Sequence, residues 1–140
     1  MLDLWTAKKT LDAALAHAVA HNFKPMAIAV LDARGALKAF VAQDGTSLKR
    51  GEIAICKAHG ALAMGLGTRA LMKRAETQPY FIAAATAAVG GALIPVPGGV
   101  LIKSAGAVIG AIGLSGDTSD NDEAAAFAAI AAAGLEADGG

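Results

Sequence analysis

The sequence contains few of the residues that usually reveal a function. It has one cysteine, Cys56, so no disulfide can form within the chain. Aromatic residues make up 4% and charged residues 17%, and 12 Lys and Arg balance 12 Asp and Glu to a formal net charge of +0. Because the chain has no excess of basic residues, its charge does not indicate binding to nucleic acid or to an anionic membrane.

Long apolar runs and a secretion signal are also missing. Glycine, proline or Lys103 interrupts every apolar stretch before it reaches the roughly 18 residues that a membrane helix needs. The N-terminal segment has no basic stretch followed by an apolar one, as a secretion signal would. We therefore expect a cytoplasmic protein in which residues 1–140 form one domain.

The chain is instead rich in apolar side chains, at 55% of its residues. Between Glu76 and Asp117 the only charged residue is Lys103. A small chain has much surface to cover with few charges, so we expect part of the apolar surface to be buried between subunits of a homo-oligomer. Ala16 and Ala20, on the back of the first predicted helix, would let a second copy approach closely.

Hydrophobic periodicity predicts a mixed chain of helices and strands. Apolar residues recur every three or four positions over residues 3–21, as in a helix that packs on a core. Alternating side chains and turn signals at Gly35 and Gly106 predict two β-hairpins. We expect helices over 3–21, 48–64, 68–75, 79–90 and 118–133, and strands over 26–32, 37–41, 92–96, 100–103 and 107–114. The expected order is αββαααβββα, with a frayed tail after Gly134.

Several short motifs follow one another along the chain. They are Leu31-Asp32, Gly35, Asp44-Gly45, Lys57-Ala58, Gly98-Gly99, Val-Ile-Gly-Ala-Ile-Gly-Leu-Ser-Gly over residues 108–116, and Asp122. None of these motifs is specific alone. Their order and spacing, from about residue 10 to residue 130, resemble the GlcG/HbpS-like family.

The resemblance implies an α/β fold of the α+β kind, a profilin-like antiparallel sheet of about five strands with helices packed on it. It also implies a small-molecule ligand and self-association, as a homodimer or a larger assembly such as an octamer. Some members of the family bind haem, and others are encoded in catabolic operons without an assigned reaction. The resemblance therefore implies haem or another tetrapyrrole as the cofactor, or an accessory role in catabolism.

Two histidines in the first predicted helix are candidate ligands. His17 and His21 lie four residues apart, so both point to the same side of the helix. His21 is the better candidate for a haem-iron ligand, because it lies nearer the helix end. The alternative is a pair of solvated or interface histidines, since this pair lacks the third ligand of a zinc site.

Charged residues near the predicted corner between the sheet and the second helix form another candidate site. Lys57 and Arg74 would hold a small organic acid, and a carboxylate such as Asp44 would accept a proton. On this hypothesis the chain is a cofactor-free enzyme for a small acid or carbonyl metabolite, with its pocket at a subunit interface. The alternative is structural, with Asp44 bonding turn amides and Lys57 pairing with a carboxylate. A purely structural or accessory oligomer is the third hypothesis.

These residues predict one pocket between the second helix, residues 79–91 and the Gly98-Gly99 turn. Apolar side chains such as Phe81 and Val96 would form its wall, and Lys57 and Arg74 its polar groups. The sequence thus leaves a binding protein and an enzyme open. The predicted ligand-binding residues are His21, Asp44, Lys57, Arg74, Phe81, Gly98 and Gly99, with His21 on haem iron.

Overall fold

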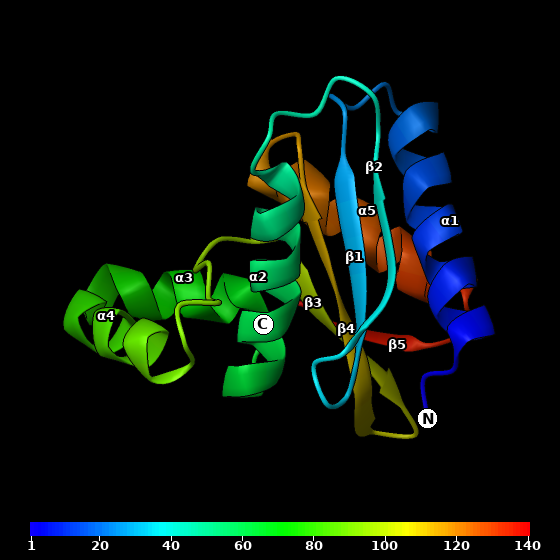
Figure 1. Ribbon diagram of the computed structural model, residues 1–140. Coiled ribbons are helices and arrows are strands. Elements are labelled where there is room, and N and C mark those ends of the chain that lie inside the picture. The colour runs from blue at the N-terminus through cyan, green and yellow to red at the C-terminus, as the bar shows by residue number, and fades with distance from the viewer.

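An antiparallel sheet lies between two layers of helices in the computed structural model, which describes residues 1–140 (Figure 1). Its strands are β1 (Ala27–Asp32), β2 (Leu37–Ala42), β3 (Gly99–Ser104), β4 (Ala107–Ser115) and β5 (Glu136–Asp138). They are ordered β2-β1-β4-β3-β5, and every neighbouring pair is antiparallel. The predicted α+β class and five-stranded sheet are confirmed.

The helices cover the sheet unequally. They are α1 (Leu4–Ala20), α2 (Arg50–Met64), α3 (Thr68–Thr77), α4 (Pro79–Ala88) and α5 (Ser119–Ala132). Helices α1 and α5 pack together on one face, and α2 packs on the other, mainly against β4 and β1. Helices α3 and α4 extend from the end of α2 away from the sheet (Figure 1). None of the helices combines the length and hydropathy needed to cross a membrane.

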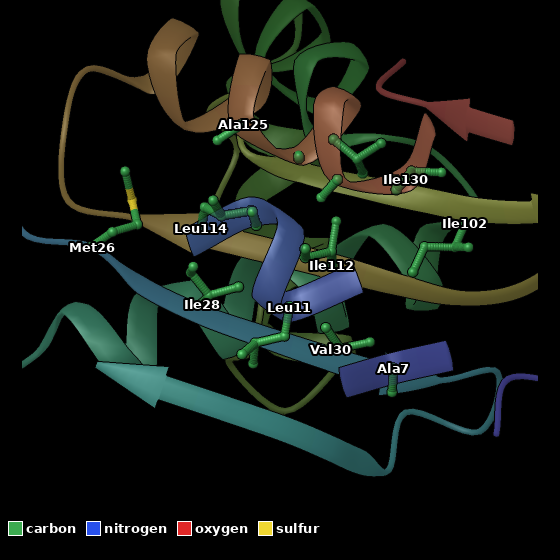
Figure 2. Close-up of a cluster of buried hydrophobic side chains, with 14 of the residues drawn as sticks. Ala7, Leu11, Met26, Ile28, Val30, Ile102, Ile112, Leu114, Ala125 and Ile130 are labelled. Atoms are coloured by element: carbon green, nitrogen blue, oxygen red, sulfur yellow. The ribbon is translucent and has the colours of Figure 1, made fainter. Parts of the chain in front are cut away.

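The alternation of side chains in β1 divides the core between the two layers. Ile28 and Val30 point toward α1 and α5 and belong to the main cluster of 16 buried residues (Figure 2). Ala27, Ala29 and Leu31 point to the other face, where they pack in smaller clusters with alanines of α2. Small side chains on this face let α2 lie close to the sheet.

Gly113 shows how close that approach is. A Cβ atom added there would lie 1.9 Å from the carbonyl oxygen of Ala54 in α2. Any side chain at this position would push α2 away from β4, so the strand needs a glycine. The Gly-Ala-Ile-Gly run of the sequence therefore serves helix packing, and it lies within a strand rather than in a nucleotide-binding loop.

Both predicted hairpin turns are confirmed. Gly35 has a φ of 83°, in the left-handed region that favours glycine, and β1 pairs with β2 across it. Ala105 and Gly106 have φ values of 50° and 78°, and connect β3 to β4. Positive φ at both central residues matches the twist of the flanking strands.

Two predictions are wrong: residues 92–96 do not form a strand, and the tail after Gly134 is not frayed. Residues 92–96 are irregular, and Leu93 is buried in a separate cluster with side chains of α3 and α4. Pro95 and Pro97 lack the N–H group that a strand donates to its neighbour, which explains the absence of pairing. The fifth strand is instead β5, which pairs with β3 after α5. Asp138 Oδ2 accepts a 2.6 Å bond from Lys103 Nζ and fastens the tail.

Candidate functional site

His17 and His21 form a small aromatic cluster with Phe23 where α1 ends. The two imidazole rings stack with centroids 3.9 Å apart, and Phe23 lies 5.7 Å from each. His21 Nδ1 is 2.9 Å from the carbonyl oxygen of His17. A carbonyl oxygen only accepts, so Nδ1 of the exposed His21 ring carries a proton, and in the neutral tautomer the lone pair is on Nε2. Partial burial, and then the neighbouring His21, lower the pKa of His17 below its ordinary value, which favours the neutral ring.

Lys57 is buried and paired inside the protein. Its Nζ donates 2.8 Å to the carbonyl oxygen of Leu114 and 3.1 Å to Asp122 Oδ2. The two charged side chains are 3% and 2% exposed. Burial lowers the pKa of Lys57 and raises that of Asp122, and their mutual attraction offsets part of each shift. The pair joins α2 to α5 at the end of β4, the structural arrangement expected as the alternative for Lys57.

Gly98 and Gly99 pack directly on α2 beside this pair. Gly98 has a φ of 121°, and a Cβ atom there would lie 2.8 Å from Lys57 Nζ. A Cβ atom on Gly99 would lie 2.4 Å from the Lys57 carbonyl oxygen. The backbone N–H of Gly99 donates 2.8 Å to Thr68 Oγ1 at the start of α3. Atoms of α2 and α3 therefore occupy the space beside the Gly98-Gly99 turn.

Arg74 and Phe81 meet on the outer side of α3 and α4. The Arg74 guanidinium carbon lies 4.0 Å from the centre of the Phe81 ring, and Arg74 Nε also donates to Gln78 Oε1. Asp44 is exposed in the loop after β2, and its carboxylate makes no hydrogen bond or ion pair within the chain. Gln43 bonds that loop instead, with Oε1 accepting 2.8 Å from the Met26 N–H.

The structure brings Lys57 together with Gly98 and Gly99, and Arg74 together with Phe81, but it does not join these two groups with His21 and Asp44 in one site. His21 follows α1 on one face of the sheet, whereas Lys57, Arg74 and Phe81 belong to helices on the other. Of the expected pocket wall, Phe81 is half-buried against a cluster that contains Leu71 and Ile82, and Val96 is half-buried in the segment before β3. No hollow opens between α2, residues 79–91 and the Gly98-Gly99 turn.

Two hollows open instead on either side of the β1–β2 turn. One, of about 140 Å³, is lined by Ala33, Arg34, Gly35, His59, Leu62 and Ala63. The other, of about 320 Å³, is lined by Met1, Leu2, Asp32, Ala33, Arg34, Val108 and Ile109. Both lie at the end of the sheet opposite the C-terminal end of α1 (Figure 1).

His59 lines the smaller of the two hollows, and it was not among the predicted site residues. It is half-buried on α2, and its Nδ1 lies 2.9 Å from the carbonyl oxygen of Ala92. Its position two residues after Lys57 could have drawn attention to it in the sequence. Only the fold, however, shows that the β1–β2 turn lies beside its ring. No group of three or more His, Cys, Asp or Glu side chains is placed to hold a metal ion.

Residues 2–131 match the family described as haem degrading protein HbpS-like. Among solved structures, the chain is similar to a PduOC:haem complex, with 26% identity, a TM-score of 0.86 and 96% of each chain covered. It is similar to HbpS with 28% identity and a TM-score of 0.80, over 93% of this chain and 88% of that one. The chain is also similar to Klebsiella pneumoniae ORFY, of family DUF336, with 23% identity and a TM-score of 0.85, over 94% of this chain and 90% of that one. At this identity the similarity supports the fold only. No curated protein matches.

Proposed function

Because the chain belongs to the HbpS-like family, which confirms the resemblance seen in its motifs, we propose that it binds haem or a related tetrapyrrole through His21. The similar PduOC structure is a haem complex, which supports this ligand class. The observation that carries the proposal is the exposed His21 ring, whose Nδ1 is held by the His17 carbonyl and whose Nε2 is free.

The donor chemistry at this place fits haem iron. A neutral imidazole nitrogen is a common axial ligand, and the bond at the opposite ring nitrogen fixes the tautomer and the ring orientation. Phe23, which lies 5.7 Å from each of the two rings, offers apolar surface to a porphyrin. When bound, haem would supply an iron centre for binding small ligands or exchanging electrons.

His21 lies on a surface rather than in a cavity, so a flat ligand there would be covered on one side only. We propose that a second copy of the chain supplies the other cover. Ala16 and Ala20 are exposed on the same helix and would permit close contact between two copies of α1. The site and the self-association are then parts of one proposal.

A haemin titration followed by the Soret band tests the ligand. We expect the wild type to shift and sharpen the band, and His21→Ala to abolish the shift while circular dichroism shows an intact fold. The chain has three histidines, so His59→Gln provides a matched control that should bind haemin as the wild type does. A shift that survives in His21→Ala, or is lost in His59→Gln, would contradict ligation by His21.

A further inference from the structure

The hollow between the β1–β2 turn and the second half of α2 has the character of a separate ligand site. We propose that it binds a small carboxylate that also carries a hydroxyl group. The proposal rests on two polar side chains, Arg34 and His59, that line the hollow with free hydrogen-bonding groups.

His59 is oriented so that one ring nitrogen can accept. Its Nδ1 lies 2.9 Å from the Ala92 carbonyl oxygen and therefore carries a proton, so in the neutral tautomer the lone pair is on Nε2. The ring atom Cδ2, bonded to Nε2, lies 3.7 Å from the place that a Cβ atom of Gly35 would occupy. This edge of the ring faces the turn across the hollow, and Nε2 has no partner within the chain. A ligand hydroxyl is a suitable donor to it.

Arg34 supplies the positive charge. Its side chain is 82% exposed, and one of its five N–H groups donates 3.2 Å to Asp32 Oδ2. The remaining donors are free to form the paired bonds that a guanidinium makes with a carboxylate. Asp32 does not line this hollow, and its Oδ1 already accepts from the N–H groups of Arg34 and Ala36. Its negative charge is thus engaged within the turn.

The size and the remaining wall restrict the ligand. Ala33, Leu62 and Ala63 form the apolar part of the lining, which suits a short carbon skeleton. A volume of about 140 Å³ holds roughly five water molecules at ~30 Å³ each, so an acid of roughly three carbons fills it and a porphyrin does not fit. The hollow lies at the other end of the sheet from His21, so the proposal is independent of haem binding.

NMR titrations with sodium lactate test this site through the His59 ring and the Gly35 amide. We expect saturable shifts at both. Propionate lacks the hydroxyl and lactamide lacks the charge, so each should bind more weakly than lactate. If propionate bound as tightly as lactate, the proposed bond from the ligand hydroxyl to His59 Nε2 would be wrong. If lactamide bound as tightly as lactate, the proposed contact of the carboxylate with Arg34 would be wrong. Inorganic phosphate or sodium chloride giving the same shifts would show an unspecific anion effect and overturn the proposal.

Three variants locate the binding. Arg34→Gln should weaken lactate binding by about tenfold or more, the usual effect of losing charged hydrogen bonds. Ala63→Leu should block the hollow without touching either polar side chain, because residue 63 is exposed on α2 and tolerates a larger side chain. Lys73→Gln removes an exposed cation on α3, away from the hollow, and should bind as the wild type does. Unchanged binding in Ala63→Leu, with the fold intact, would place the ligand outside the hollow.

Discussion

Lys57 and Asp122 are the two charged residues that the fold buries, and they are buried together. Removing two charges from water costs several kcal/mol each, and the pair recovers this cost only while both partners are present. The Leu114 carbonyl also accepts from Lys57 Nζ, and Asp122 Oδ1 accepts 3.1 Å from the Asp117 N–H. The pair therefore depends on four parts of the chain being in place at once.

We predict that Lys57→Met destabilises the protein by about 3–5 kcal/mol, because it leaves the Asp122 carboxylate buried without a cation. The double variant Lys57→Met/Asp122→Asn should lose less than the sum of the two single losses, since neither charge remains. Urea unfolding measures all three free energies. Lys49→Met is the control, because its ion pair with Glu52 is exposed and should contribute about 1 kcal/mol or less. Equal losses for the two lysine variants would contradict the burial argument.

Sequence reasoning anticipated that Lys57 could pair with a carboxylate, but not which one. Asp122 lies 65 residues further along the chain, and no local pattern links the two positions. His59 was missed for the same reason, because its neighbours come from the β1–β2 turn and from Ala92. Pairing between distant segments follows from the fold, whereas periodicity reports only on local neighbours.

The helices and hairpins were predictable because local signals agree there. Turn glycines mark both hairpins, and side chains cap the starts of α1 and α5, where Asp3 Oδ1 accepts 2.8 Å from the Thr6 N–H and Thr118 Oγ1 accepts 3.1 Å from the Asn121 N–H. Residues 92–96 and β5 were not predictable in this way. Three residues of β5 form a strand only because the edge of β3 is available to pair with them.

Asp117 fastens the beginning of α5 to the segment that follows α1. Its carboxylate accepts from the Lys24 N–H at 2.7 Å, from the Thr118 N–H at 2.8 Å and from Asn121 Nδ2 at 2.7 Å. The bond from Lys24, followed by the other two, lowers the pKa of Asp117 below 3.8. The folded protein therefore favours the ionised carboxylate more than the unfolded chain does.

We predict that Asp117→Asn lowers the melting temperature at neutral pH, and that the difference from the wild type disappears in acid. The contribution of a carboxylate with a lowered pKa is complete above its unfolded value of 3.8 and is lost as the pH falls through the lower folded value. Thermal unfolding from pH 7 down to the acid limit of folding gives both curves. Asp12→Asn, at an exposed carboxylate of α1 without bonds, should follow the wild type throughout. A difference independent of pH would show that the charge of Asp117 is irrelevant.

Several large apolar side chains remain exposed when the chain is considered alone. Leu48 is 90% exposed, Trp5 76% and Tyr80 70%. Scattered apolar side chains are normal on a protein surface, but a chain with 17% charged residues has little else to cover it. Association between copies, the prediction made from composition, remains the simplest explanation of this surface.

We predict that light scattering at micromolar concentration gives a mass at least twice that of one chain. Ala16→Glu should lower this mass, because it places a charge on the face of α1 where we expect the second copy. Ala132→Glu makes the same change at an exposed position of α5 and should leave the mass unaltered. A monomeric wild type would refute association. A mass for Ala16→Glu equal to that of the wild type would show that this face of α1 is not in the interface.

The two edges of the sheet are unequal, and this limits how copies could join through their backbones. At one edge β2 presents six residues, whereas at the other β5 presents three. Head-to-tail growth would need β2 of one copy to pair with β5 of the next, over a contact only half as long as β2. Two β2 strands could instead pair with each other about a twofold axis, which uses up both long edges. Such a pair would leave only the two β5 edges open, and three residues at each edge offer little backbone for further growth.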